Sequence, residues 1–211
     1  MMSILSKKSI LVTGGTGSIG TALVKKAITD NAKLIRIFSN DENALYEMET
    51  EYGNYKNIEY VIGDIQNPEI VSEIVKDIDI VFHAAALKHV DRCELNPLET
   101  INVNIIGTKN ITKAAQRENI ERMIFISTDK AVNPIGVMGA TKLLGEKLIS
   151  AEATHKSKTI FASVRFGNVF QTRGSILPRI EKQISKGGPI TLTNPEMKRF
   201  FMSKDDAVNL I

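Results

Sequence analysis

The hydrophobic residues of this chain gather in short runs in which almost every position is apolar. Continuous apolar runs are typical of strands buried on both faces, whereas strands with one face in water alternate apolar and polar residues. The pattern therefore predicts a sheet covered by helices on both sides. Six runs are rich in β-branched residues and have the length of strands: Ser9–Thr13, Leu34–Phe38, Ile58–Ile62, Ile78–Phe82, Met123–Ser127 and Ile160–Arg165.

Segments with helical spacing of apolar residues lie between these runs. A regular alternation of strand and helix requires right-handed crossovers and predicts an α/β fold with a doubly wound parallel sheet. No repeat, low-complexity tract or linker interrupts residues 1–165, so we expect one domain there. The predicted helices are Gly20–Thr29, Glu42–Glu51, Glu69–Lys76, Leu98–Glu118 and Met138–Ala153.

The composition of the sequence changes after Arg165. Turn-forming and basic residues become frequent there, on both sides of one predicted helix, Ser175–Ser185. The last residues, 204–211, have the pattern of a helix start with acidic residues in the first turn and contain no stop signal. We expect residues 166–211 to begin a substrate-binding portion. We also expect the chain to be a fragment that lacks a C-terminal part.

The amino-acid composition and net charge limit the classes of function that this chain could have. The chain has 211 residues, 43% of them hydrophobic and 24% charged, as in soluble globular proteins. A net charge of +3 without a Lys/Arg stripe argues against nucleic acid and is compatible with an anionic small ligand.

The single cysteine, Cys93, excludes an internal disulfide and a multi-cysteine metal site, and we expect no metal. No apolar run approaches the roughly 20 residues that span a bilayer. A cytoplasmic protein without membrane contact is the expectation.

A glycine-rich loop, "VTGGTGSIG" (residues 12–20), lies between the first predicted strand and the first predicted helix. Glycines in such a loop let the backbone approach a pyrophosphate, and the helix N-terminus supplies N–H donors. The alternative is a tight turn that needs glycine for its φ angles. The strand-loop-helix context favours a Rossmann dinucleotide site, with contacts expected from Gly14, Thr16, Gly17, Ser18, Ile19 and Gly20.

Ser39, Asn40 and Asp41 follow the second predicted strand. A carboxylate there would bind the ribose 2′-hydroxyl of NAD, whereas a basic residue would favour NADP. Asp41 could equally cap the next helix, so the two interpretations stay open.

The third and fourth strands end in further candidates for the cofactor. Asp64, with Ile65 beside it, lies where the amino group of adenine could be bound. Small residues after the fourth strand would let the cofactor lie close to the backbone; these are Ala84, Ala85 and Ala86.

Six segments in order carry a family resemblance: "HAAALKHV", "NPLETINVNIIGTKNI", "STDKAVNP", "GATK", "RFGNV" and "EMKRFFMS". With them the chain resembles the extended short-chain dehydrogenase/reductase family over essentially its whole length. More narrowly it resembles the UDP-N-acetylglucosamine 4,6-dehydratases of capsule and flagellin glycan biosynthesis (CapD-like proteins), a branch that also includes epimerases. The resemblance implies a tightly bound, recycled NAD or NADP, a UDP-sugar substrate and a homo-oligomer.

In the wider family, a tyrosine four residues before Lys142 relays the substrate hydroxyl proton, and the lysine holds the nicotinamide ribose. This chain has Met138 at that position, and a thioether cannot transfer a proton. All four tyrosines precede the fourth predicted strand, and none is well placed to substitute. Either other residues transfer the proton or the site does not transfer it at all.

The end of the fifth strand offers Thr128, Asp129 and Lys130, where side chains face the ligand crevice of a parallel sheet. The resemblance assigns the last two to elimination across C5 and C6 of the sugar. Lys130 would remove the C5 proton and Asp129 would protonate the departing C6 hydroxyl. Thr128 or Asp129 with Lys142 is our expectation for the 4-hydroxyl proton. The alternative for Asp129 and Lys130 is an exposed surface ion pair.

Other positions complete the expected site. Lys88 and His89 follow the fourth strand and are expected in the nicotinamide or substrate pocket. Asn102 is expected to satisfy backbone groups beside the cofactor. Guanidinium groups match phosphate oxygens, so the uridine diphosphate is expected to contact Arg165, Asn168, Arg173 and Arg199.

Three functions follow from these residues. The first is a nucleotide-sugar 4,6-dehydratase acting in polysaccharide or glycan biosynthesis. The second is a UDP-sugar 4-epimerase, which would not need the Asp129–Lys130 pair. The third is a non-catalytic dinucleotide sensor, which the missing tyrosine would permit.

Overall fold

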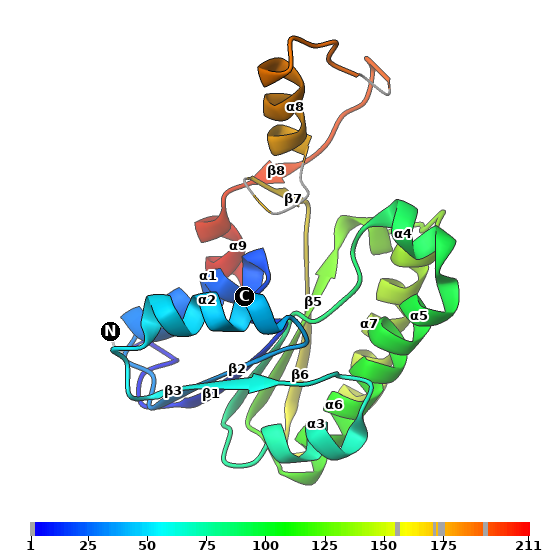
Figure 1. Cartoon of the computed structure of the whole chain (residues 1–211). Coiled ribbons are helices and arrows are strands. Elements are labelled where there is room, and N and C mark those ends of the chain that lie inside the picture. The colour runs from blue at the N-terminus through cyan, green and yellow to red at the C-terminus, as the bar shows by residue number, and fades with distance from the viewer. Residues whose placement is uncertain (1–2, 155–156, 171, 173–175, 192–193) are drawn as a thin grey trace.

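The computed structural model describes residues 3–154, 157–170, 172, 176–191 and 194–211. Its centre is a six-stranded sheet with the order β3-β2-β1-β4-β5-β6, in which all neighbouring strands are parallel (Figure 1). The chain order reverses between β1 and β4, which is where open α/β sheets bind ligands. The predicted fold is confirmed, and the strands are β1 (Ser9–Thr13), β2 (Leu34–Ser39), β3 (Ile58–Ile62), β4 (Ile80–His83), β5 (Arg122–Thr128) and β6 (Ile160–Phe166).

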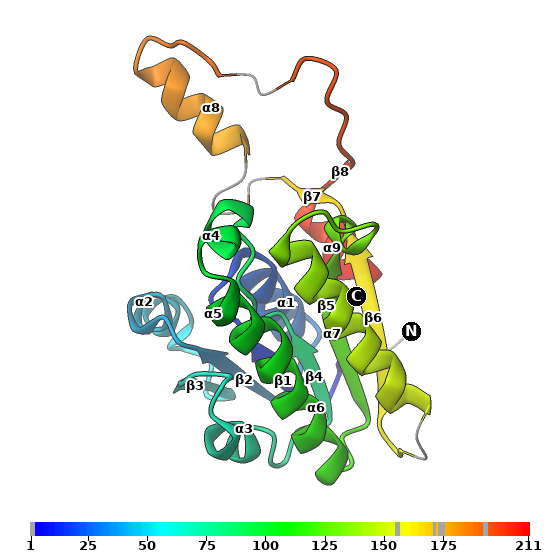
Figure 2. The same ribbon diagram turned by 90° about the vertical axis from the view of Figure 1, so that its right-hand side faces the viewer.

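Helices cover both faces of the sheet (Figures 1 and 2). One face carries α1 (Ser18–Thr29) and α2 (Glu42–Tyr52), and α9 (Lys204–Leu210) contacts α1. The other face carries α3 (Pro68–Ile74), α6 (Thr108–Arg117) and α7 (Val137–Thr154).

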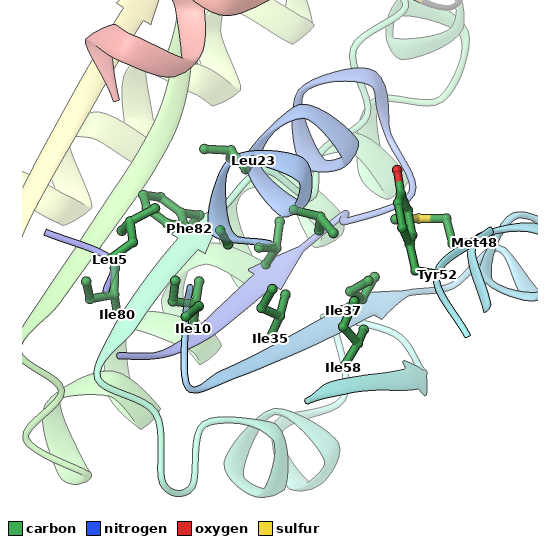
Figure 3. Packing of buried hydrophobic residues seen from close by; sticks show 14 of the residues in the cluster. Leu5, Ile10, Leu23, Ile35, Ile37, Met48, Tyr52, Ile58, Ile80 and Phe82 are labelled. Atoms are coloured by element: carbon green, nitrogen blue, oxygen red, sulfur yellow. The ribbon is translucent and has the colours of Figure 1, made fainter. Parts of the chain in front are cut away.

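Two hydrophobic clusters fill the spaces between the sheet and its helices. Alternate side chains of β1 point to opposite sides, so Ile10 and Val12 join one cluster and Leu11 joins the other. In Figure 3, Leu23 of α1 lies over the strand residues of the first cluster. All five residues of β1 are buried, which explains the apolar run Ile10–Val12 at its centre.

The helix predicted over residues 98–118 is wrong in one respect, because its middle is not α-helical. It consists of α5 (Pro97–Ile101), a π-helical segment η1 (Asn102–Gly107) and α6. Within η1 the Asn104 amide pairs with the backbone of Leu87, accepting from its N–H at 2.8 Å and donating to its carbonyl at 3.0 Å. The π turn thus occurs where Asn104 bonds to a distant loop. The spacing of apolar residues in the sequence does not indicate this contact.

A short helix, α4 (Val90–Leu95), was not predicted. Its Glu94 accepts a hydrogen bond from the backbone N–H of Val137 at 2.6 Å, at the first residue of α7. The sequence around it has no clear helical periodicity, so tertiary contact stabilises it.

After β6 the chain leaves the sheet. β7 (Asn168–Val169) and β8 (Phe201–Met202) form a small parallel pair, and α8 (Ile176–Ser185) stands away from the helices of the main body (Figures 1 and 2). Of the predicted helix 175–185, Ser175 lies outside the described residues. The division into two portions at residue 165 stays a prediction. Among the described helices, none is both long and apolar enough to cross a membrane.

Gly145 lets α7 lie close to β5. A Cβ at this position would stand 2.6 Å from the ring of Phe125, too near for a fully buried aromatic side chain to accommodate without a shift. We expect Gly145→Ala to destabilise the protein by about 1–3 kcal/mol through overpacking, although alanine is the better helix former by about 1 kcal/mol. Urea unfolding measures the difference. The exposed Ser150→Ala on the same helix is the control, and a stabilising Gly145→Ala would contradict the close packing.

Candidate active site

A cleft of about 740 Å³ opens at the carboxyl ends of the strands. Its walls come from the segments that follow β1 to β6, and from α7. These segments are far apart in the sequence, and the parallel sheet brings their polar residues to one edge.

The glycine-rich loop forms one end of the cleft. Gly14 has a φ of +64°, and a Cβ there would lie 2.7 Å from the backbone nitrogen of Ala85. At Gly17, the N-cap of α1, the nearest atom to an added Cβ is a carbonyl oxygen 3.2 Å away, and no side chain caps the helix. Both interpretations of the loop therefore apply. Gly14 forms a tight turn, and Gly17 lies at a helix N-terminus that no side chain covers. The predicted residues Gly14, Thr16, Gly17, Ser18, Ile19 and Gly20 all line the cleft.

The loop after β2 is linked to the glycine loop by a buried hydrogen bond of 2.7 Å between the hydroxyls of Thr16 and Ser39. Ser39 also accepts from the backbone N–H of Asp41 at 3.1 Å. Asp41 caps α2 by accepting from Ala44 N–H through Oδ1 at 3.1 Å, so the capping interpretation is confirmed. Ser39, Asn40 and Asp41 line the cleft, and the ribose contact stays a prediction.

Asp64 and Ile65 line the same end of the cleft. The Asp64 carboxylate accepts from the backbone N–H of Gln66 at 2.8 Å and from its side-chain amide at 3.2 Å. That amide also donates to Glu99 Oε1 at 2.9 Å. Asp64 is therefore held in place from its own loop, and its contact with adenine stays a prediction.

Ala84, Ala85 and Ala86 line the cleft as predicted. The role expected of Asn102, however, is wrong. Asn102 is exposed on η1 and is absent from the cleft wall, whereas Asn104 is 1% exposed and holds the backbone of Leu87. Asn104 also donates to the hydroxyl of Thr141 at 3.0 Å, which ties η1 to α7.

His83, at the end of β4, connects three elements beneath the cleft. Its Nδ1 lies 2.7 Å from the Thr13 hydroxyl, and its Nε2 lies 3.0 Å from the Thr108 hydroxyl. Because Thr108 donates its proton to the carbonyl of Asn104, it must accept from Nε2–H. Burial lowers the pKa of His83 to about 3, with Lys142 adding to the effect, so this histidine is neutral and structural.

Lys142 lies in the wall of the cleft and is 6% exposed. Its Nζ stands 4.1 Å from the centre of the Phe125 ring, a cation–π contact. Burial lowers the pKa of this ammonium to about 7, while the Glu146 carboxylate raises it. Met138, one turn earlier on α7, is 4% exposed and also lines the cleft.

Thr128, Asp129 and Lys130 form a hydrogen-bonded group where β5 ends. Lys130 Nζ lies 3.0 Å from Asp129 Oδ1, and the Thr128 hydroxyl donates to the same oxygen at 3.0 Å. The side chains of Asp129 and Lys130 are 29% and 39% exposed, so the pair is half-buried rather than free in solvent. Thr128 and Lys130 line the cleft, whereas Asp129 is not part of its wall and stands behind Lys130 through their hydrogen bond. Lys130 also donates to Asn168 Oδ1 at 3.4 Å.

Only some of the predicted substrate-binding residues lie in the wall of the cleft. Lys88, His89, Asn168 and Arg199 line the cleft. Arg165 does not; it donates to Glu146 through both Nε and a terminal nitrogen. Arg173 lies outside the described residues.

The sequence analysis missed Glu146, Asn104 and the structural role of His83. Glu146 follows Lys142 by four residues, a spacing that would have placed both on one helix face. Within the described part of the chain, no group of three His, Cys, Asp or Glu residues could hold a metal ion.

A family model described as polysaccharide biosynthesis protein matches residues 10–211. The chain belongs to this family. The resemblance to the extended short-chain dehydrogenases and to CapD is thereby confirmed.

Curated members of the polysaccharide biosynthesis family are similar to nearly the whole chain. "Uncharacterized membrane protein MJ1061" of Methanocaldococcus jannaschii is 52% identical over 97% of this chain and 62% of its own length. A UDP-glucose 4-epimerase of Rickettsia bellii is 45% identical over 97% and 61%. The capsular polysaccharide biosynthesis protein CapD of Staphylococcus aureus is 43% identical over 98% and 36%. This chain thus spans less than two thirds of the length of these relatives.

Solved structures share the fold of this family member. Pen from Bacillus thuringiensis matches with a TM-score of 0.95 and 40% identity, over 99% of this chain and 67% of that chain. A dTDP-glucose 4,6-dehydratase of Streptomyces venezuelae with NAD bound matches with a TM-score of 0.84 over 95% and 70%. At 20% identity the second likeness concerns the fold alone.

The buried ammonium of Lys142 makes the stability of this family member depend on pH. The pKa is about 7 in the folded protein and 10.5 ordinarily. Between these values the folded state loses its proton first, so the free energy of unfolding rises with pH; below about 7 the whole cost of burying the charge remains. We expect Lys142→Met to be more stable than the parent at pH 7 by more than about 1 kcal/mol, since one pKa unit corresponds to about 1.4 kcal/mol.

Chemical unfolding of the cofactor-free protein at several pH values measures this difference. The advantage of Lys142→Met should shrink as the pH approaches 10. Lys147→Met, on the exposed side of the same helix, should follow the parent at every pH. Parallel curves for Lys142→Met and the parent would show that Lys142 is not a destabilised cation.

Proposed function

We propose that this chain is the dinucleotide-binding part of a UDP-N-acetylglucosamine 4,6-dehydratase that acts in polysaccharide or glycan biosynthesis. The observation that carries the proposal is the half-buried Lys130–Asp129 pair at the carboxyl end of β5, 3.0 Å between Nζ and Oδ1. An acid and a base joined at the ligand edge of a parallel sheet are suited to the elimination of water.

The residues of the cleft fit a dinucleotide. The uncapped start of α1 presents backbone N–H groups where Gly17 leaves room for a pyrophosphate. Asp41 and Asp64 would bind the adenosine half, and Lys142 would bind the nicotinamide ribose. When bound, the nicotinamide supplies reversible hydride exchange with the sugar.

Lys130 and Asp129 have separate tasks in this proposal. The half-exposed Lys130 ammonium first loses a proton to solvent, and the neutral amine then removes the proton from C5, which a ketone at C4 has made acidic. Asp129 donates a proton to the oxygen at C6, so that water leaves. Because the two groups are hydrogen-bonded, a change of charge on one alters how readily the other holds its proton. Lys130 also donates to Asn168 Oδ1 at 3.4 Å.

The proton of the 4-hydroxyl needs an acceptor other than a tyrosine. Thr128 stands next to Asp129 and donates to it, so a proton arriving at the Thr128 oxygen can pass on to the carboxylate. Lys142 favours the developing negative charge from the side of α7. Met138 only packs in this arrangement.

The remaining expectations belong to the same proposal. The UDP group of the substrate would meet Lys88, His89, Asn168 and Arg199 at the outer part of the cleft. Arg173 stays a candidate, and Arg165 is a weaker one because Glu146 already engages it. NAD or NADP as cofactor, a homo-oligomeric state and a cytoplasmic location are expected with it.

A 4-epimerase is the second candidate, favoured by the 45% identity to a protein of that name. An epimerase needs only reversible oxidation at C4 and rotation of the keto sugar, and does not use the Lys130–Asp129 pair. A dinucleotide sensor without turnover is the third, and the tyrosine-free face of α7 favours it.

Incubation with UDP-N-acetylglucosamine and NAD or NADP in deuterated water distinguishes the three. We expect a product that has lost water and gained deuterium at C5, read by mass spectrometry and NMR. An epimer of unchanged composition would support the second candidate, and the absence of any product would support the third.

Substitution of the pair tests the assignment of roles. We expect Lys130→Met and Asp129→Asn each to lower the rate of dehydration by about 10²-fold or more, because each removes a general acid or base. Dinucleotide affinity should change little. Lys147→Met, which alters the charge equally outside the cleft, should retain the parent rate. Dehydration at the parent rate by Lys130→Met would exclude Lys130 as the base.

A further inference from the structure

Glu146 is a carboxylate for which the proposed reaction has no use. It follows Met138 and Lys142 on α7 at intervals of four residues, so the three side chains lie along one face of the helix. The Glu146 side chain is only 11% exposed. A carboxylate this deeply placed is stable only when its charge and hydrogen-bonding capacity are satisfied.

Two strands supply the partners of Glu146. Ser127 of β5 donates its hydroxyl proton to Oε1, and Arg165 of β6 donates to Oε1 through Nε at 2.7 Å and to Oε2 through a terminal nitrogen. Ser127 and Arg165 are direct partners in the β5–β6 register, so their side chains lie on the same face of the sheet, beneath α7. The carboxylate is therefore fixed from three elements.

This clamp adjoins the active site. Ser127 is the neighbour of Thr128 and itself lines the cleft. On α7 the carboxylate lies one turn from Lys142, at the i, i+4 spacing where opposite charges attract. Glu146 thus bonds directly to Arg165 of the outer strand and lies one helical turn from Lys142 in the wall of the cleft.

The surroundings of Lys142 give Glu146 a particular importance. From β4 it faces His83, which is neutral; from β5 it faces the ring of Phe125. Met138 on its own helix provides no hydrogen bond to it. Of the described groups, Glu146 is the negative charge that acts on Lys142.

We propose that Glu146, held by Ser127 and Arg165 one helical turn from Lys142, is a positioning residue whose charge keeps Lys142 an ammonium ion in a site without the tyrosine. Arg165 then serves to hold Glu146 rather than to bind substrate. The inference deepens the proposed function, since Lys142 is assigned there to the nicotinamide ribose. It concerns the charge on Lys142, however, and does not require that the protein turn over a sugar.

The test is a titration of Lys142 in protein labelled with ¹³C at the lysine ε position. The Phe125 ring should displace the Lys142 signal, and its loss in Lys142→Met assigns it. We expect Glu146→Gln to shift the protonation equilibrium of Lys142 about tenfold toward the neutral amine, since a nearby opposite charge alters a pKa by roughly 1–3. Glu146→Asp should restore part of the effect.

Glu152→Gln is the matched control. It removes a carboxylate from the same helix, where Glu152 accepts from Gln116 at 2.6 Å, and should leave the titration of Lys142 unchanged. An unchanged titration in folded Glu146→Gln, or an equal shift in the control, would overturn the proposal.

A second variant keeps the test independent of any folding defect in Glu146→Gln. Arg165→Gln leaves the carboxylate in place and removes its strongest competitor for Lys142, so the lysine should hold its proton more tightly. Opposite shifts in the two variants would support electrostatic control, because loosening of the structure would expose Lys142 in both. Shifts in the same direction would overturn it. If the titration behaves as expected while no sugar is converted, only the proposed function fails.

Discussion

Burial of both faces of the central strands of the parallel sheet is the constraint on which the rest of this structure depends. All residues of β1 and β4 are buried, so the middle of each of these strands is apolar. The polar residues of the cleft follow the carboxyl ends of the strands. The same constraint that makes the core therefore collects the chemistry at one edge. His83, the buried polar side chain at the end of β4, is accommodated because threonine hydroxyls satisfy both of its ring nitrogens.

The sequence was sufficient to predict the features that follow from local pattern. Apolar runs placed the six strands, and the glycine spacing placed the loop before α1. The predictions were wrong where a contact between residues far apart in the sequence determines which way a side chain points. Asn104 rather than Asn102 faces the backbone of Leu87 because of the π turn, and no local periodicity indicates which of the two turns inward. Likewise, Arg165 has the chemistry of a phosphate ligand, but strand register puts it beside Glu146.

Two lysines of the cleft, Lys130 and Lys142, lie in different surroundings. Lys130 is half-exposed, joined to a carboxylate and open to the cleft, whereas Lys142 is buried against an aromatic ring. Lys130 is therefore placed for direct contact with a bound ligand, whereas Lys142 acts on the cleft mainly through its charge. In this arrangement Met138 is compatible with the proposed chemistry, because the proposed proton steps use Thr128 at the end of β5 and Asp129 and Lys130 in the short turn that follows it.

The π-helical segment between α5 and α6 has a consequence for how this chain can vary. Its wider turn accommodates one residue more than an α-helix would in the same length, and that surplus sets the phase in which Asn104 meets Leu87 and Thr141. Loss of a single codon from residues 102–107 would let the segment close into a regular α-helix, with the helices on either side keeping nearly the same phase. The wide turn that brings the Asn104 amide to the strand-four loop would then be lost. This stretch should therefore tolerate replacement of its exposed side chains far more readily than any change in its length.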